Sequence, residues 1–218
     1  MTSSNLIEII KIELDCRLNK NNNFISIKNK SENELLLINE EIKYFLLSSD
    51  TISFKFNNFD FNLKIYNKSN DLLENINLNI SLLKISGIGE DSYIESSKNK
   101  LKIKDINSND IIYDSNLNNI TVKCILIFNI DNNNNIYPIK INKGNCGINL
   151  PYSDFFMSIN DTVRIKNTFI KGRQFFLNKK ARKIEFDNIK LYNIITDPSN
   201  TFFSNGFIIN SYYTNLLN

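Results

Sequence analysis

Ile52-Ser53-Phe54-Lys55-Phe56 and Phe61-Asn62-Leu63-Lys64-Ile65 decide the fold, because apolar and polar residues alternate along both stretches. Successive side chains of a β-strand point to opposite faces, so the alternation predicts strands with one buried and one solvated face. The pattern recurs at Ile76–Ile80, Leu101–Ile103 and Ile139–Ile141. Asparagine-rich clusters separate these segments, and asparagine tolerates the left-handed backbone of tight turns. The sequence therefore predicts an all-β protein of antiparallel β-sandwich-like domains.

The composition limits both helices and chemistry. The chain has 218 residues, 42% of them hydrophobic, and a formal charge of +3. Ala181 is the only alanine, and since alanine is the best helix former, long helices are not expected. Only the stretch 33–47 could be read as a short helix. The chain has no histidine, which excludes histidine-based catalytic triads and histidine metal sites. We expect no enzyme activity, no cofactor and no metal.

The N-terminal region is interrupted by charges. Glu8, Lys11, Glu13 and Asp15 break any apolar core of a signal peptide. No stretch reaches the roughly 20 apolar residues that a membrane-spanning helix needs. We therefore expect synthesis in the cytoplasm without a signal peptide, and no membrane partner.

Segments of the first half recur in the second half in the same order, displaced by half the chain. The matched pairs are Ile12–Cys16 with Ile120–Cys124, Asp50–Lys55 with Asp161–Lys166, and Ile80–Ile85 with Ile189–Ile194. Self-similarity at a fixed spacing is the signature of repeated modules. The pattern predicts two tandem domains.

The domain boundaries follow from the limits of the repeat. We place a first β-domain at 1–95, a second at 96–200, and an aromatic segment at 201–218 beyond the last match. The second domain has a strand-like lead-in at 100–116, for which the first has no room. The first domain is therefore expected to lack one edge strand.

The second half resembles the SPOCS domain of clostridial spore-envelope proteins. The similarity covers 100–194 and begins with the strand Val122–Ile127. It continues with Leu150-Pro151-Tyr152-Ser153-Asp154-Phe155-Phe156, which is similar to that family's apolar-Pro-aromatic-Ser-x-aromatic signature. Strands at 161–166 and 184–194 complete the family's layout.

The first half would be a diverged copy, because Ile42-Lys43-Tyr44-Phe45 stands where the signature is expected. The resemblance implies a β-rich module of bacterial spore coats or of the appendages that project from spores. It implies that the partners are further copies of the chain in a homopolymer, together with other spore-envelope proteins. The location it implies is the spore surface or the outer spore layers.

The three cysteines, Cys16, Cys124 and Cys146, are an odd number and cannot all pair within the chain. Cys146 lies in the loop-like Gly144-Asn145-Cys146-Gly147 and is the best candidate for an intermolecular crosslink. Cys16 and Cys124 occupy matching strand positions, where they could crosslink or serve as small buried hydrophobes. Gly87-Ile88-Gly89 is the closest approach to a phosphate-binding glycine loop, and we expect a turn between domains there.

The segment 171–190 is locally basic, with phenylalanines interleaved. Lys179, Lys180, Arg182 and Lys183 are candidates for binding an anionic polymer. The alternative is a hairpin whose phenylalanines face the core while its lysines stay in solvent. The nearly balanced charge of the rest of the chain argues against nucleic acid as the partner.

The tail 201–218 concentrates aromatic residues around a strong turn signal, Asn205-Gly206. One interpretation is the last strand of its own domain. The other is a donor strand that pairs with the incomplete edge of the first domain in the next subunit, a contact that propagates into a filament. The candidate donor residues are Phe202, Phe203, Phe207, Ile209, Tyr212 and Tyr213.

The sequence thus predicts a non-enzymatic structural protein that self-assembles head to tail into a spore-associated filament or coat layer. Intermolecular disulfides would reinforce it once the surroundings become oxidising. Two other functions remain open at this point: a virion or phage-tail structural protein, and a module that binds glycan or another cell-wall polymer.

Overall fold

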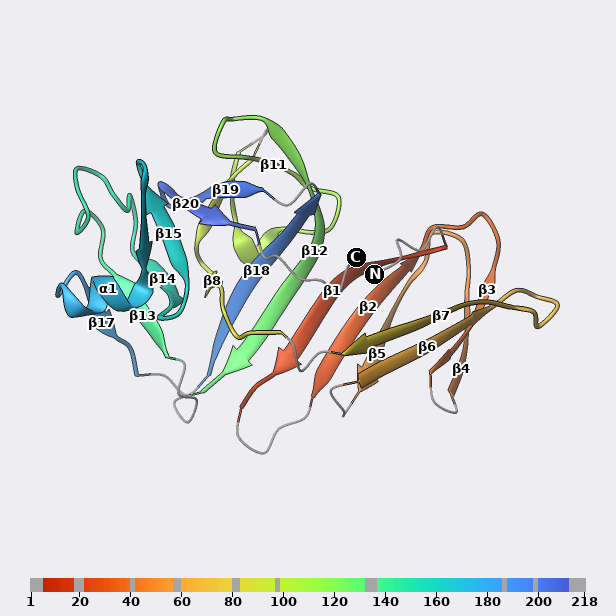
Figure 1. Cartoon of the computed structure of the whole chain (residues 1–218). Helices are drawn as coiled ribbons and strands as arrows, with labels where there is room; N and C mark the ends of the chain where they lie inside the picture. The colour runs from red at the N-terminus through yellow and green to blue at the C-terminus, as the bar shows by residue number, and fades with distance from the viewer. Residues whose placement is uncertain are drawn as a thin grey trace. The chain divides into compact units, whose positions relative to one another are not determined.

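The computed structural model describes residues 6–17, 22–39, 42–56, 60–79, 83–96, 99–131, 137–185, 188–197 and 200–211 (Figure 1). The strands are β1 (Ile7–Asp15), β2 (Asn23–Asn29), β3 (Leu35–Asn39), β4 (Ile42–Leu46), β5 (Thr51–Phe56), β6 (Asp60–Tyr66), β7 (Leu72–Asn79), β8 (Ile88–Gly89), β9 (Tyr93–Glu95), β10 (Lys100–Lys102), β11 (Ile111–Tyr113), β12 (Asn119–Ile130), β13 (Pro138–Ile141), β14 (Phe155–Ser158), β15 (Thr162–Ile165), β16 (Thr168–Lys171), β17 (Ala181–Lys183), β18 (Ile189–Asp197), β19 (Thr201–Ser204) and β20 (Phe207–Asn210).

Helices contribute little to the regular structure. Within the ranges given above, the one α-helix is α1 (Gly172–Leu177), and a short 3-10 helix spans Ile103–Asp105. The prediction of an all-β, antiparallel fold is confirmed. In the part of the chain that the structure describes, no helix has the length and apolar character needed to cross a bilayer.

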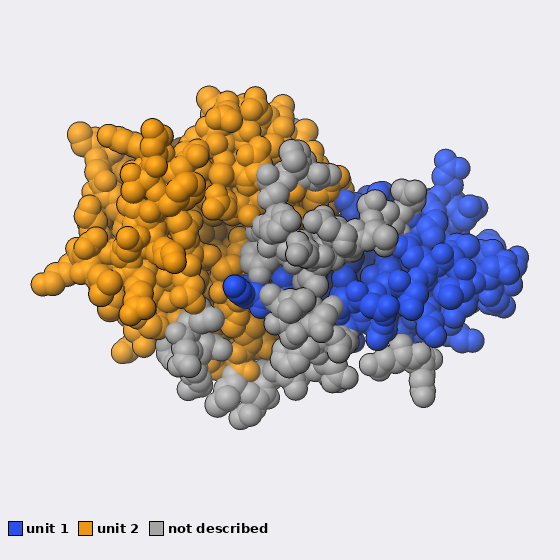
Figure 2. Space-filling model, viewed as in Figure 1, with its two compact units in different colours: residues 1–12, 21–84, 214–218 blue, residues 13–20, 85–213 orange. Residues whose placement is uncertain are grey.

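The chain divides into two compact units, coloured blue and orange in Figure 2. The described parts of the units are residues 6–12 and 22–84 for unit 1, and residues 13–17 and 85–211 for unit 2.

The division between the units differs from the predicted one. The chain passes from unit 1 to unit 2 at Lys84–Ile85 rather than at 95–96. The reason is that β8 pairs with β14 and β18, and β9 pairs with β19, all of them strands of unit 2. The strands at Thr201–Asn210 also belong to unit 2 rather than to a separate segment.

Unit 1 packs two antiparallel sheets face to face. In one, β2 lies between β1 and β5, with a register from Asn23↔Phe56 to Lys28↔Thr51. In the other, the order is β4–β3–β6–β7. The sheets meet where the Phe54 ring of β5 lies 5.8 Å from the Phe61 ring of β6. The most deeply buried core residues, each at most 1% exposed, are Ile12, Ile25, Ile27, Leu35, Leu37, Phe54, Phe61, Leu63 and Ile65.

Unit 2 also consists of two sheets around one core. The first has the order β17–β13–β14–β8–β18–β12, and β11 also pairs with β12. The end of β1, residues 13–15, lies next to β12. The second has the order β10–β9–β19–β20–β15–β16. Their shared core includes Ile94, Ile112, Val122, Ile139, Phe155, Met157, Val163, Phe202 and Phe207.

The matched sequence segments do not occupy matching places in the two units. β5 pairs with β2, whereas its sequence counterpart β15 pairs with β16 and β20 in the other sheet of its unit. β13, which follows the second cysteine strand as β2 follows the first, pairs with β14 and β17. The sequence similarity therefore does not correspond to a repeated strand order.

The stretch 33–47 contains the antiparallel strand pair β3 and β4 instead of a helix. Its run Leu35-Leu36-Leu37 is buried throughout, although successive residues point to opposite faces of the strand. This second buried face distinguishes β3 from the half-solvated strands that the alternation predicted.

Candidate interaction surfaces

The aromatic tail forms a hairpin in unit 2. β19 pairs with β20 through Phe202↔Ile209, and β20 pairs in turn with β15. Phe202 and Phe207 are fully buried, and the Phe207 ring lies 5.0 Å from the Phe155 ring. Phe203 is only half-buried. The hairpin completes the core of its own unit.

This placement is the alternative to strand donation that the sequence left open. In the conformation described here, Phe202, Phe207 and Ile209 are occupied by intramolecular packing and are not exposed to a neighbouring copy. Tyr212 and Tyr213 lie outside the described residues.

Asn205 joins the tail hairpin to two other segments. It is fully buried at the turn, with φ of 50°, and Gly206 follows with φ of 86°, as the Asn-Gly signal predicted. Its Oδ1 accepts a hydrogen bond from the Tyr93 N–H at 2.6 Å. Its Nδ2 donates to Ser153 Oγ at 2.8 Å and to the Asp154 carbonyl oxygen at 3.1 Å. The Tyr152 N–H also donates to the Asn205 carbonyl oxygen at 3.3 Å, so three residues of the signature-like segment are bonded to this turn.

The aromatic residue of that segment also has a structural role. Tyr152 lies with its hydroxyl 3.3 Å from Glu95 Oε1, to which it donates a hydrogen bond. The Lys100 Nζ lies 3.9 Å from the centroid of the Tyr152 ring. Burial, and then the charge of Glu95, raise the pKa of Tyr152 far above its ordinary value. The signature-like residues therefore hold the two sheets of unit 2 together.

Cys16, Cys124 and Cys146 are thiols rather than members of disulfides in this structure. Cys124 is fully buried in β12. Burial, and then the charge of Asp15, raise the pKa of Cys16 to about 11. Burial also raises the pKa of the half-buried Cys146, although the charge of Lys180 opposes the shift. Because the thiolate is the reactive form, Cys16 and Cys146 are expected to react slowly near neutral pH.

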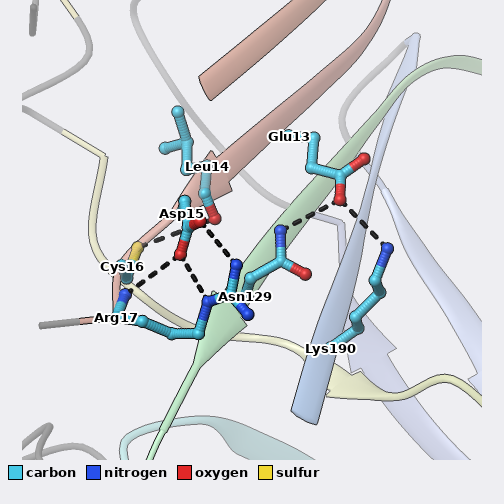
Figure 3. Close-up of polar contacts among 7 residues, drawn as sticks. All are labelled: Glu13, Leu14, Asp15, Cys16, Arg17, Asn129 and Lys190. Atoms are coloured by element: carbon cyan, nitrogen blue, oxygen red, sulfur yellow. Dashed lines mark hydrogen bonds and ion pairs between the residues drawn. The ribbon is translucent and has the colours of Figure 1, made fainter. Parts of the chain in front are cut away.

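The charged residues at the end of β1 form a cluster within unit 2 (Figure 3). The Glu13 carboxylate accepts hydrogen bonds from Asn129 Nδ2 at 2.9 Å and from Lys190 Nζ at 3.0 Å. The Asp15 side chain is 1% exposed and accepts from Arg17 Nε at 2.7 Å and Nη2 at 2.6 Å. Each acid is thus matched to a donor, as buried charges require, and the two bonds of Glu13 link the end of β1 to β12 and β18. Across the described ranges, no three Cys, Asp or Glu side chains converge to hold a metal ion.

A basic face covers β16, α1 and β17 of unit 2. The strand β17 pairs with β13 and forms an edge of its sheet. The exposed cations of this face are Lys171, Arg173, Lys179, Lys180, Arg182 and Lys183. Within the described part of the chain, none of these cations lies within salt-bridge distance of an acid. Phe169 and Leu177, which belong to the same elements, are 55% and 67% exposed. The four predicted polymer-binding residues are all exposed and lie in β17 and the turn before it, where Arg182 and Lys183 point to opposite faces of the strand.

A row of apolar side chains crosses the outer face of the four-stranded sheet of unit 1. Strand register sets Phe45 opposite Leu36 and Leu36 opposite Tyr66. Tyr66 is paired with Leu72 where the register of β6 and β7 shifts by one residue, as at a β-bulge. Residues directly opposite each other share one face of a sheet. Phe45 is 70% exposed and Leu72 is 55% exposed, while Leu36 between them is buried. We call Phe45, Leu36, Tyr66 and Leu72 the apolar row.

The next row on the same face is polar except for Ile38. Lys43 is opposite Ile38, Ile38 is opposite Lys64, and Lys64 is opposite Asn75. The apolar row is therefore a narrow stripe with a basic margin on this side. It runs from one edge strand of the sheet to the other.

Both edges of this sheet are open in the described part of the chain: β4 and β7 each have one neighbouring strand there. The edge β4 carries exposed apolar residues at Ile42 (56%) and Phe45 (70%), and Leu47 just beyond it is 57% exposed. At the other edge, Leu72 and Leu73 are 55% and 45% exposed. Open edges with exposed apolar side chains are templates for pairing with another chain.

Sequence reasoning missed the apolar row. Phe45 was noted only as part of a diverged signature, and Leu36 and Leu72 were not singled out. The signal that could have found them is the uninterrupted run Leu35–Ile38, because an all-apolar strand has two faces to cover. The members of the row come from four strands, so only the registers bring them together.

Comparison with known proteins shows no family. No family model matches the sequence, and no curated protein matches it. Among solved structures, the chain is similar to the crystal structure of the gp41-1 intein, with a TM-score of 0.41 and 12% sequence identity over 58% of this chain and 98% of that chain. A likeness at this level supports no conclusion about function. The proposal below therefore rests on the fold and the surfaces.

Proposed function

We propose that the protein is a non-enzymatic structural protein whose copies self-assemble by head-to-tail strand complementation into a spore-associated filament or coat layer. The observation that supports it most is the apolar row, which ends at two open strand edges. The spore setting rests on the resemblance of 100–194 to spore-envelope modules. The complementing edge is that of the first unit, as the sequence suggested, while the tail hairpin is retained in unit 2.

The size of the contact suggests weak pairwise and strong collective association. Covering a large apolar side chain such as Phe45 or Leu72 contributes about 2 kcal/mol, and each new backbone hydrogen bond about 1 kcal/mol. Association of two proteins costs at least about 4 kcal/mol in lost freedom of motion. A single edge contact is therefore modest, and assembly should depend steeply on protein concentration.

The Phe45→Lys variant is expected to assemble about tenfold less, or worse, at equal concentration, because it replaces an exposed apolar anchor with a charge. Sedimentation velocity across a concentration series, together with electron microscopy of the pellets, measures the effect. Phe24→Lys is the matched control: Phe24 is 39% exposed on β2, in the other sheet of unit 1.

Two outcomes would contradict the proposal. One is a wild-type protein that stays monomeric up to the highest soluble concentration. The other is an equal loss of assembly in the Phe45→Lys and Phe24→Lys variants, since general loss of solubility or folding would then explain both. Circular dichroism of each variant checks that it is folded.

A second candidate function, binding of an anionic cell-wall polymer, is favoured by the basic face of unit 2. Six exposed cations lie there without an ion-pair partner among the described residues, next to exposed Phe169 and Leu177. Unpaired cations release counterions from a polyanion, which makes such binding strongly dependent on salt.

The Lys179→Ala/Arg182→Ala double variant is expected to elute from an anionic cell-wall polysaccharide at clearly lower salt than the wild type. Removing two cations should reduce the slope of log affinity against log salt by roughly 1 to 2. The control is Lys30→Ala/Lys55→Ala, which removes two exposed cations of unit 1. Equal retention of all three proteins, or retention on single-stranded DNA alone, would rule this function out.

A further inference from the structure

We propose that β4 of one copy pairs antiparallel with β7 of the next copy, with Lys43 opposite Asn75, so that the four-stranded sheets of unit 1 continue into one another. This inference rests on the proposed self-assembly and names its partner surface, which is a second copy of the same chain. This contact uses β4 and β7, the two edge strands of the four-stranded sheet, whereas donation would require the tail hairpin to leave its own unit.

The polarity of the two edges permits this pairing. β4 is antiparallel to β3, β3 to β6, and β6 to β7. Three reversals leave β4 and β7 running in opposite directions. A second copy displaced across the sheet, without being turned round, therefore presents its β4 antiparallel to β7. Because the two surfaces are different, the contact is heterologous and repeats without limit unless the rotation closes a ring.

The alternation of backbone hydrogen bonds is compatible with the same register. Opposed residues in antiparallel strands alternate between hydrogen-bonded and non-hydrogen-bonded pairs as a row crosses successive strands. The row Lys43–Ile38–Lys64–Asn75 uses three such pairs. Asn75 with Lys43 of the next copy would be a fourth pair. With four pairs, hydrogen-bonded and non-hydrogen-bonded pairs each occur twice, so the next copy continues the same alternation.

The side chains of the two edges also match in this register. On the outer face, Phe45 of the next copy lies against Leu72 and Leu73, so the apolar row continues across the junction. On the inner face, Ile42, which is 56% exposed, comes beside Ile76 at the border of the core. β4 carries one cation, Lys43 on the outer face, and β7 carries one anion, Glu74 on the inner face, so the two edges have opposite net charge.

Cysteine crosslinking between two separate proteins tests the register. One protein carries Lys43→Cys, and the other carries Asn75→Cys with a tag that gives it a different mass. Directly opposed Cβ atoms lie about 5 Å apart, within reach of a disulfide. After mixing under assembly conditions and mild oxidation, a mixed dimer should form on a non-reducing gel, several-fold above that of wild type mixed with wild type.

Two control pairings make the result specific. Asn77→Cys lies two residues further along β7, and Lys55→Cys lies on β5, the edge of the other sheet. Both should give much less mixed dimer with Lys43→Cys than Asn75→Cys does. Assembly with equal crosslinking to all three, or with none to Asn75→Cys, would overturn the β4–β7 pairing while leaving self-assembly intact. Absence of assembly in the wild type would instead overturn the proposed function.

Discussion

The Asn205→Ala variant is expected to lose about 3 kcal/mol of unfolding free energy. Alanine at a left-handed position costs about 1 kcal/mol, and Asn205 has φ of 50°. Loss of the side chain also leaves the part-buried Tyr93 N–H without its acceptor at 2.6 Å, and leaving such a group unsatisfied costs about 1–3 kcal/mol when it is buried. Urea unfolding followed by circular dichroism measures the change.

Asn70→Ala separates the two contributions. Asn70 is exposed at a turn and also has a left-handed φ, 63°, so the variant should lose only the backbone contribution of about 1 kcal/mol. If Asn205→Ala destabilises the protein no more than Asn70→Ala, the hydrogen bonds of Asn205 do not stabilise unit 2 as described.

The Asp161→Asn variant is expected to remove a pH dependence of the wild type. Burial raises the pKa of Asp161 from 3.8 to about 7, although hydrogen bonds from the Gly87 and Ser158 backbone oppose the shift. Its Oδ2 accepts a hydrogen bond from the Gly87 N–H, and the Gly172 N–H donates to its carbonyl oxygen at 2.7 Å. Burial outweighs the hydrogen bonds to the carboxylate, so the site favours the neutral form of this carboxyl.

The sign of the effect follows from linkage. Below about pH 4 the carboxyl is protonated in both states, and its contribution to stability is fully present. As pH rises towards 7, the unfolded chain ionises while the folded chain does not, so this contribution falls, by up to about 4 kcal/mol above pH 7. Asparagine keeps an acceptor for Gly87 and cannot ionise, so Asp161→Asn should gain stability relative to the wild type as pH rises.

Asp91→Asn is the control with the opposite sign. Hydrogen bonds from Lys102 and then Lys104 lower the pKa of Asp91, so its contribution to stability is present above its unfolded pKa and is lost in acid. Its variant should therefore lose stability relative to the wild type as pH rises. Unfolding at about pH 2, 3, 4, 6 and 8 samples both windows, because the change at Asp91 falls below pH 4 and that at Asp161 above it. Parallel curves for Asp161→Asn and wild type would contradict the shifted pKa.

The local structure of many strands could be predicted from the sequence, because it depends on neighbouring residues. The alternating stretches 52–56 and 61–65 lie in β5 and β6, and Asn205-Gly206 forms the expected turn. The helix α1 was missed, since a single short turn of helix carries too little periodicity to detect. Gly172 begins it, and a Cβ there would lie 2.7 Å from the Ser158 carbonyl oxygen.

Strand partners could not be predicted in the same way, because they depend on contacts between distant segments. The duplication suggested equal roles for 50–55 and 161–166, yet one lies beside β2 and the other beside β16 and β20. The tail hairpin was recognisable, but its position against Phe155 was not. The apolar row is hidden for the same reason, since three separate registers are needed to assemble it.

Because β1 contributes to both units, it limits how unit 2 can be transferred between genes during evolution. Residues 13–17 belong to unit 2, although the rest of that unit begins at residue 85. They supply the Cys16 N–H that donates to the Asn129 carbonyl oxygen at 2.8 Å, and the carboxylate that binds Lys190. A gene fragment that encodes only the later residues lacks this strand end. Unit 2 therefore cannot be transferred whole to another gene by a single recombination at the boundary, and the two units are expected to evolve as one piece.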